Sequence, residues 1–315
     1  MITVEHLTKW YGGTRAVEDL CFSIEKHGVY GFLGPNGAGK STTLNILTGC
    51  LSPTQGTVTV CGHDILEEPK KAKGHMGYLP EQPPLYLQES PWDYLCFVGE
   101  AKGLRGQALE NQVFSALSRT GTMDVCRKAL GSLSKGYRQR VGIAQAILGD
   151  PDIIILDEPT VGLDPRQITE IRELIQKLGG NKTVILSSHI LGEVQAVCER
   201  LLILSKGKLV ACDTPANLEK QMSSASALEI DVCASTEQAE KLLSRLPNVQ
   251  SFKSKGTADR CQIRLETEKE HLEDLSKAVF FALAEAGTPL LAMTPTKASL
   301  EDIFLGLTEG KEPEA

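Results

Sequence analysis

The chain contains 315 residues, of which 41% are hydrophobic, and its formal net charge is −7 at pH 7. This length predicts about two domains, and basic residues spread along an acidic chain do not form a surface that follows nucleic-acid phosphates, so we expect no nucleic-acid partner. No apolar run approaches the roughly 20 residues that cross a bilayer, so any role at a membrane requires a separate polypeptide.

Strand patterns recur along the first two thirds of the chain. They fall at residues 3–6, 20–24, 29–33, 57–60, 76–79, 153–156, 183–187 and 200–204. Helical patterns separate many of them, and the runs at 153–156 and 184–186 are continuously apolar, as expected of parallel strands that are covered on both faces. The pattern predicts an α/β core.

Residues 90–149 lack a good strand pattern and are predicted to form a helical insert. The insert opens with Ser90, which can cap a helix, Pro91, which fits the first helical position, and Asp93, which can close a capping box. A further helical run is predicted over residues 139–148.

A second module follows a polar boundary at about residues 213–226. Its pattern predicts, in order, a strand at 227–233, a helix at 236–246, strands at 249–253 and 261–265, a helix at 268–286 and a strand at 289–293. This βαββαβ order, with Lys255 and Gly256 predicted to turn the hairpin, is typical of a small ferredoxin-like α+β sandwich. A final short helix is predicted at 299–307, and residues 309–315 are predicted to be a disordered tail.

The nine cysteines are single residues in mostly apolar surroundings. None belongs to a C-x-x-C pair or to a Cys/His cluster in the sequence, so their spacing indicates neither a metal site nor a redox site. They are interpreted as small hydrophobic residues in a reducing cytosol.

A phosphate-binding loop follows the predicted strand at 29–33. It matches G-x-x-x-x-G-K-[ST] and consists of Gly34, Pro35, Asn36, Gly37, Ala38, Gly39, Lys40 and Ser41, with Thr42 opening the helical run behind it. The glycines let backbone N–H groups surround the β-phosphate of ATP, Lys40 reaches the β- and γ-phosphates, and Ser41 offers a hydroxyl to Mg²⁺.

Two adjacent carboxylates end the apolar strand at 153–156. They are predicted to face opposite sides of the strand and therefore to take different roles. Asp157 is predicted to hold Mg²⁺, and Glu158 to orient the attacking water beyond the γ-phosphate and take its proton.

A second glycine motif, Ser134-Lys135-Gly136, precedes the helical run at 139–148. A hydroxyl, free N–H groups and the positive end of a helix dipole together attract phosphate. The alternative is an ordinary helix cap, Ser134, followed by a glycine turn.

Residues 1–213 resemble the ATP-binding subunit of an ABC transporter. The resemblance rests on the phosphate loop, the Ser134-Lys135-Gly136 signature, the Asp157-Glu158 strand end, the aspartate loop Val161-Gly162-Leu163-Asp164 and His189, all in family order. The segments Gly77-Tyr78-Leu79-Pro80-Glu81 and 299–304 resemble the ABC-2 exporter branch, which includes drug and antibiotic export subunits.

The resemblance implies a P-loop NTPase core of ABC type, with an antiparallel β subdomain and a helical insert, in a domain of residues 1–220. A small accessory domain would occupy residues 221–308 and serve as a support for the dimer or, alternatively, as a ligand sensor. The implied function is an ATP hydrolase, with ATP and Mg²⁺, that powers an ABC-2 exporter.

Roles for single residues also follow from the resemblance. Tyr11 matches the aromatic that stacks on adenine, with Trp10 a weaker candidate and a buried aromatic the alternative for both. His189 matches the switch histidine that contacts the γ-phosphate, and Asp164 lies in the loop along the dimer seam. Ser134 and Gly136 would contact the nucleotide of the opposite subunit, so ATP would join a homodimer.

One position departs from the family, which normally has a glutamine that coordinates Mg²⁺. Counting back along the chain from Pro83 places Glu81 at the position of this glutamine, and Gln82 is the next residue. We prefer Glu81, whose extra negative charge beside triphosphate should tighten the metal requirement.

The implied partner is an integral-membrane permease on a separate chain, which would hold this subunit at the cytoplasmic face of the cell membrane. A groove formed by residues 81–86 and the insert aromatics Trp92, Tyr94 and Phe97 would receive a permease helix, although at least two of these three are expected in the core of the insert. The alternative functions are a soluble, non-transport ABC ATPase that acts on a macromolecular complex, and an ATP sensor, against which Glu158 argues.

Overall fold

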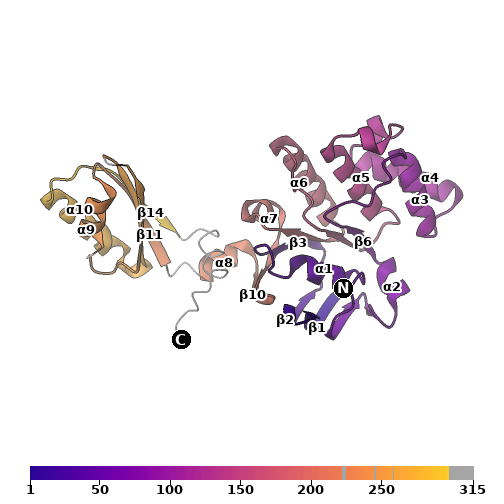
Figure 1. The fold of residues 1–315 in the computed structure, drawn as a ribbon, viewed down its shortest axis with the longest axis horizontal. Helices are drawn as coiled ribbons and strands as arrows, with labels where there is room; N and C mark the ends of the chain where they lie inside the picture. The colour runs from indigo at the N-terminus through magenta and orange to yellow at the C-terminus, as the bar shows by residue number, and fades with distance from the viewer. Residues whose placement is uncertain (222–224, 245, 258, 298–315) are drawn as a thin grey trace. The chain divides into compact units, whose positions relative to one another are not determined.

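The computed structural model describes residues 1–221, 225–244, 246–257 and 259–297, which form two compact units (Figure 1). The first unit spans Met1–Thr214, and the second begins at Pro215. Within the described ranges, no helix is long and apolar enough to span a membrane. The predicted helix at 299–307 and the predicted tail lie outside these ranges.

A six-stranded sheet forms the centre of the first unit, in the order β10-β9-β3-β8-β7-β6. Its strands are β3 (Gly28–Leu33), β6 (Met76–Leu79), β7 (Ile153–Leu156), β8 (Thr183–Ser188), β9 (Arg200–Ser205) and β10 (Lys208–Asp213). All pair in parallel except β10, which is antiparallel to β9. Since parallel strands end at one edge, the segments after β3, β7 and β8 meet there.

An antiparallel sheet of order β2-β1-β4-β5 packs beside this core. It contains β1 (Ile2–Tyr11), β2 (Thr14–Ile24), β4 (Gln55–Val60) and β5 (His63–Asp64). The first two strands are longer than predicted because their pairing shifts register around His6 and Asp19, which have φ of 50° and 48°. These bulges interrupt the alternation of apolar and polar residues by which a strand is predicted from its sequence, so the predicted strands are too short.

Helices cover the core sheet and form the insert. They are α1 (Lys40–Leu47), α2 (Pro69–Gly74), α3 (Pro91–Ala101), α4 (Gly106–Arg119), α5 (Lys135–Ile147), α6 (Pro165–Gly179) and α7 (Leu191–Val197), with 3₁₀ turns at Met123–Val125 and Leu130–Ser132. The predicted cap is present, since the Asp93 N–H donates to Ser90 Oγ at 3.2 Å. The prediction that a helix of the insert begins at residue 139 is wrong, because α5 already begins at Lys135.

The second unit is a four-stranded antiparallel sheet of order β12-β13-β11-β14, with two helices on one face. After α8 (Pro215–Gln221) come β11 (Ala225–Val232), α9 (Thr236–Leu243), β12 (Ser251–Gly256), β13 (Cys261–Glu268), a 3₁₀ turn (Lys269–His271), α10 (Leu272–Glu285) and β14 (Leu290–Lys297). The βαββαβ order and this strand order confirm the ferredoxin-like prediction.

The hairpin of the second unit turns later than predicted. Lys255 and Gly256 still pair with Gln262 and Cys261, and the Thr257 N–H donates to the Arg260 carbonyl at 2.8 Å. A Cβ on Gly256 would lie 2.4 Å from that carbonyl, so this glycine permits close strand approach rather than a turn.

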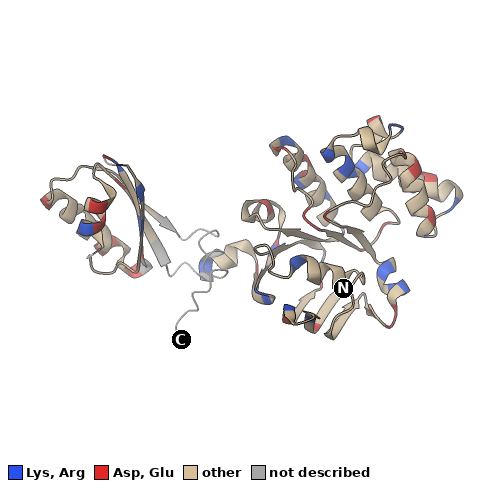
Figure 2. Ribbon diagram, in the orientation of Figure 1, with Lys and Arg blue, Asp and Glu red and all other residues tan. Residues whose placement is uncertain are grey.

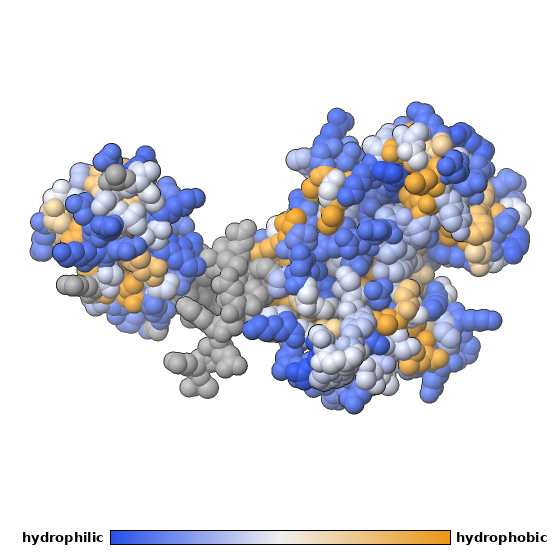
Figure 3. Space-filling model, viewed as in Figure 1, coloured by the Kyte–Doolittle hydropathy of each residue, from blue (hydrophilic) through white to orange (hydrophobic). Residues whose placement is uncertain are grey.

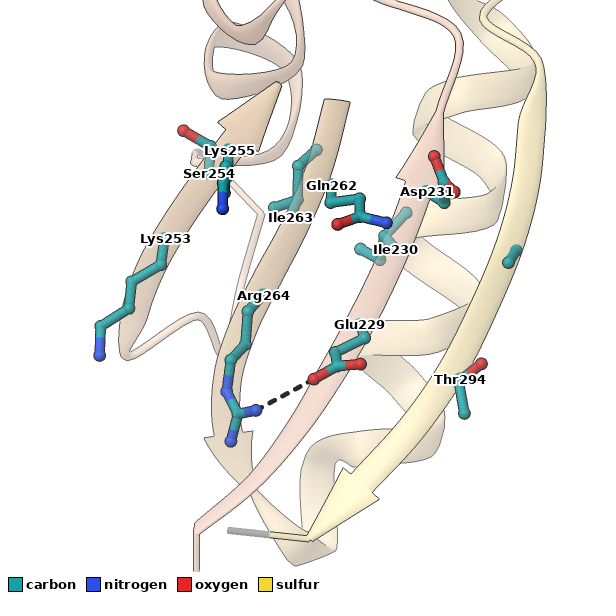
Figure 4. Close-up of a pocket in the computed structure, with 11 residues that line it drawn as sticks. Glu229, Ile230, Asp231, Lys253, Ser254, Lys255, Gln262, Ile263, Arg264 and Thr294 are labelled. Atoms are coloured by element: carbon teal, nitrogen blue, oxygen red, sulfur yellow. Dashed lines mark hydrogen bonds and ion pairs between the residues drawn. The ribbon is translucent and has the colours of Figure 1, made fainter. Parts of the chain in front are cut away.

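Apolar side chains from β11 and β13 pack under α9 and α10, whereas the other face of the sheet is polar. Figure 4 shows that open face, where Arg264 donates to Glu229 at 3.0 Å beside a shallow hollow of about 400 Å³. Figure 2 shows acidic and basic residues interspersed on the helices of both units.

Candidate nucleotide site

The phosphate loop joins the end of β3 to the start of α1, as predicted, and its shape requires glycine. Gly37 and Gly39 have φ of 82° and 98°, a conformation that other residues rarely adopt. At Gly34, which has an ordinary φ, a Cβ would lie 2.4 Å from the carbonyl of Leu204. The motif therefore has both the conformation and the close packing for which glycine is needed.

Lys40 is buried and turns its ammonium into the loop. Its Nζ donates to the Gly34 carbonyl at 2.7 Å and lies 3.8 Å from Glu158 Oε1. Burial lowers the pKa of Lys40, and the nearby carboxylates of Glu158 and Asp157 act in the opposite direction. The arrangement holds a cation beside two acids in a site of restricted solvent.

Asp157 is almost fully buried, with its carboxylate at the start of α1. Its Oδ1 accepts from Ser187 Oγ at 2.5 Å and from Ser41 Oγ at 3.4 Å. Ser187 also accepts from the N–H of Glu158 at 2.9 Å, so one hydroxyl orients both acidic residues. This role of Ser187 was not predicted, although a polar residue inside a buried strand is a visible signal in the sequence.

Glu158 has φ of 47°, so strand geometry ends before it. The prediction that the two carboxylates face opposite sides is wrong for this reason: Asp157 reaches Ser41, and Glu158 reaches Lys40, so both contact the phosphate loop. His189 Nδ1 lies 3.0 and 3.1 Å from the two oxygens of Glu158. The structure thus brings the predicted base and the predicted switch histidine together.

Lys40, Ser41, Glu158 and His189 face a cavity of about 470 Å³. It is lined by Ala16, Asn36, Gly37, Ala38, Gly39, Lys40, Ser41, Thr42, Glu81, Glu158, Val161 and His189. Glu81 lines it and Gln82 does not; Gln82 lines a neighbouring hollow with Lys135. Ala16, on β2, is a lining residue that the sequence analysis missed and for which the sequence carried no signal.

Ser134, Gly136 and Asp164 line a different cavity of the same chain, of about 370 Å³. Ser134 Oγ accepts from the Tyr137 N–H at 3.4 Å, so the helix-cap alternative describes its local contact, and Asp164 likewise caps α6 through the Gln167 N–H at 2.9 Å. The predicted signature and the phosphate loop therefore do not share a cavity within one chain.

The cap at Ser134 explains why α5 begins earlier than predicted. Gly136 lies in the first turn of this capped helix, where a Cβ would approach the end of the flexible Gln167 side chain to 2.6 Å. The glycine is therefore part of the helix and packs closely against Gln167.

Trp10 and Tyr11 lie at the tip of the first hairpin and are 41% and 49% exposed, so the alternative that they are buried is wrong. Lys9 lies over the Tyr11 ring at 5.5 Å, and Arg15 lies over the Trp10 ring at 5.5 Å. Neither aromatic lines the nucleotide cavity, but their hairpin reaches it through Ala16.

The fold and the cavity define a P-loop nucleotide hydrolase. Similarity to known proteins shows to which family of these hydrolases the chain belongs. The profile of the ABC transporter family matches residues 17–161, and the profile of an AAA domain (putative AbiEii toxin, type IV TA system) matches residues 129–194. An uncharacterized ABC transporter ATP-binding protein, YhcH of Bacillus subtilis, is 40% identical over 213 residues, covering 67% of this chain and 68% of its own.

Two further proteins extend the comparison. The linearmycin resistance ATP-binding protein LnrL of Bacillus subtilis is 30% identical over 312 residues, covering 98% of both chains. A dimeric structure of a post-hydrolysis state of the ATP-binding cassette MJ0796, bound to ADP and Pi, superimposes with a TM-score of 0.62 and 25% identity, covering 68% of this chain and 98% of that chain.

The chain belongs to the ABC transporter family, as an ATP-binding and ATP-hydrolysing subunit. The match to LnrL spans nearly the whole chain and therefore includes most of the second unit.

Proposed function

We propose that two copies of this chain close around ATP to power an ABC-2 exporter, and that its cargo is an antibiotic or a drug-like molecule. The separation of Ser134 and Gly136 from the phosphate loop supports the closed dimer, because two facing copies related by two-fold symmetry would bring each signature to the other's cavity. The near full-length similarity to a linearmycin resistance protein supports the class of cargo.

Oxygen ligands at the edge of the cavity fit Mg²⁺. The hydroxyl of Ser41 and the carboxylate of Asp157 are 3.4 Å apart, and Glu81 lines the same cavity. Mg²⁺ prefers such hard oxygen ligands together with water and phosphate oxygens. When bound, it would neutralise charge that develops on the phosphates.

Glu158 is proposed as the general base. Its carboxylate lies between Lys40 and His189 at the cavity wall, where it can accept a proton from the water that attacks the γ-phosphate. Lys40 would bind the β- and γ-phosphates, and His189 would orient the water and contact the γ-phosphate.

The partner copy would complete the site with Ser134, Lys135 and Gly136. The start of α5 offers a hydroxyl and N–H groups at the positive end of a 13-residue helix. Asp164, which caps α6 beside this cavity, would link the two sites along the dimer seam. Contacts that exist only in the closed state let ATP favour closure, and hydrolysis would remove them.

Tyr11 is proposed to stack on adenine. We expect Tyr11→Ala to weaken ATP binding by about 1–3 kcal/mol, roughly 5- to 150-fold in Kd, because the loss of a stacked aromatic has that magnitude. Equilibrium binding of ATP would measure it, with Trp10→Ala as the matched control, since both rings are similarly exposed on one hairpin. A larger loss for Trp10→Ala would transfer the role to Trp10.

The segment before the insert and the insert itself are proposed to form an aromatic surface that binds the permease. Tyr86 and Phe97 are 54% and 53% exposed with ring centroids 5.5 Å apart, whereas Tyr94 is buried beneath Tyr86 at 6.0 Å. Trp92 is half-buried under Arg127, so the expectation that at least two of the three insert aromatics belong to its core is met only in part. Figure 3 shows hydrophobic patches on the visible face of the first unit. A permease bound here would hold the subunit at the cytoplasmic membrane face.

Co-purification with the membrane protein tests the exporter assignment. We expect the wild-type chain to recover an integral-membrane permease from detergent extracts, and Phe97→Glu to lose it while ATP hydrolysis persists, because a charge disrupts an apolar contact. Phe114→Glu on α4, where Phe114 is 55% exposed, is the matched control. Recovery of a soluble complex instead would favour the non-transport alternative.

A further inference from the structure

Three side chains of different chemistry meet at the edge of the core sheet where β6 and β7 begin. Cys61 follows β4, His75 precedes β6 and Asp152 precedes β7, and one ligand atom from each lies within 4.8 Å of the others. All three are half-buried. The nucleotide cavity lies where β3 and β7 end, so this cluster is separate from it.

We propose that Cys61, His75 and Asp152 bind a transition-metal ion of the Zn²⁺ class. Thiolate, imidazole and carboxylate are the ligands that Zn²⁺ uses in proteins, with bonds of about 2.0–2.3 Å. A tetrahedral ion with such bonds separates its ligand atoms by roughly 3.3–3.8 Å. In the structure His75 Nδ1 and Asp152 Oδ2 form a hydrogen bond of 2.7 Å, and no separation among the three ligand atoms exceeds 4.8 Å. An ion would replace this hydrogen bond and require shifts of roughly 1 Å or less. Water would fill the fourth position.

The backbone holds all three ligands in place. Met76 pairs with Ile153 in the parallel β6–β7 ladder, and the Ile153 N–H donates to the His75 carbonyl at 3.0 Å. The carbonyl of Asp152 accepts from Thr183 at 3.0 Å, and the N–H of Cys61 donates to Met1 at 2.6 Å. Backbone hydrogen bonds thus fix the positions of all three residues, as in sites built on rigid elements.

A divalent ion bound between the Cys61 sulfur and the Asp152 carboxylate would stabilise the thiolate, the form in which cysteine binds metals. His63 supports the site from outside: its ring stacks on that of His75 with centroids 6.0 Å apart, and its Nδ1 lies 2.8 Å from Glu68 Oε2.

A bound ion would connect two parts of the first unit. Cys61 directly follows a strand of the antiparallel sheet, whereas His75 and Asp152 directly precede strands of the core sheet. Because metal binding to the folded state adds to its stability, the ion would raise the melting temperature of this unit without contacting ATP.

Titration with Co²⁺, which adopts the coordination of Zn²⁺ and absorbs light, tests the site in the full-length chain. We expect the wild type to bind Co²⁺ with a thiolate-to-cobalt charge-transfer band that excess Zn²⁺ abolishes. Cys61→Ser should lose this band, and Asp152→Asn should weaken binding by about tenfold or more. Each variant should retain ATP binding, which shows that it is folded.

A second cluster, formed by His6, Asp19 and Cys21, provides the matched control. These residues are exposed on the first hairpin, and His6 Nδ1 lies 2.8 Å from Asp19 Oδ1. Cys21→Ser should leave the cobalt band and the Zn²⁺-dependent rise in melting temperature intact. A wild type without the band, a band that survives Cys61→Ser, or a band lost in Cys21→Ser would each overturn the assignment.

Discussion

Replacing Glu158 with Gln is expected to lower kcat for ATP hydrolysis by about 10²–10⁴-fold, which is the usual contribution of a general base. The amide keeps the shape of the side chain and its contacts with Lys40 and His189 but cannot take a proton from water. ATP should still bind and hold the closed dimer, so the variant should elute as a dimer with ATP on a sizing column. Phosphate release and elution volume are the measurements.

Glu193→Gln is the matched control for this experiment. Glu193 is also a buried carboxylate near the end of β8, where it accepts from Ser188 Oγ at 3.1 Å, but it does not line the nucleotide cavity. Its variant should hydrolyse ATP at close to the wild-type rate. An E158Q protein that turns over normally and stays monomeric with ATP would contradict both the base and the shared site.

A mixture of two inactive variants is expected to recover ATPase activity. Lys40→Met removes the phosphate-binding ammonium, and Ser134→Asp keeps a good helix-capping residue but places negative charge where the partner's triphosphate should bind. Each variant alone should be inactive. In an equal mixture, half of the dimers are mixed and one of their two sites is intact, so activity should reach about one quarter of wild type if the sites act independently.

Mixing Lys40→Met with Glu158→Gln is the control, because both lesions lie in the same cavity. Each site of a mixed dimer then lacks one of these groups, and no activity should return. Subunit exchange is verified with differently tagged chains. Recovery in this control, or none in the first mixture, would show that Ser134 does not act on the partner's nucleotide.

The phosphate loop was predictable because its working parts are consecutive residues. The order from Gly34 to Ser41 contains the positive-φ glycines and the lysine that the loop needs, and the strand and helix around it are adjacent in sequence. The βαββαβ order of the second unit was predictable for the same reason, since each element carries its own apolar pattern.

Errors occurred where a distant neighbour decides local structure. Gly136 looked like a turn, but Ser134 caps α5 and Gly136 lies in its first turn, close to the side chain of Gln167 on α6. Glu158 was assigned by strand alternation to the face opposite Asp157, whereas its positive φ directs it to Lys40. In both cases the local rule is sound for that residue type, but contacts in the folded protein decide the conformation at this position.

The sequence by itself determined the α/β class, the phosphate loop and the identity of the acidic pair, because these depend on neighbours along the chain. Only the tertiary structure decided that Ser187 holds both Asp157 and Glu158, that the signature lies in a separate cavity, and that Cys61 meets His75 and Asp152. The last two of these residues are 77 positions apart. Parallel pairing of β6 with β7 makes them neighbours, and no spacing rule within one segment contains that information.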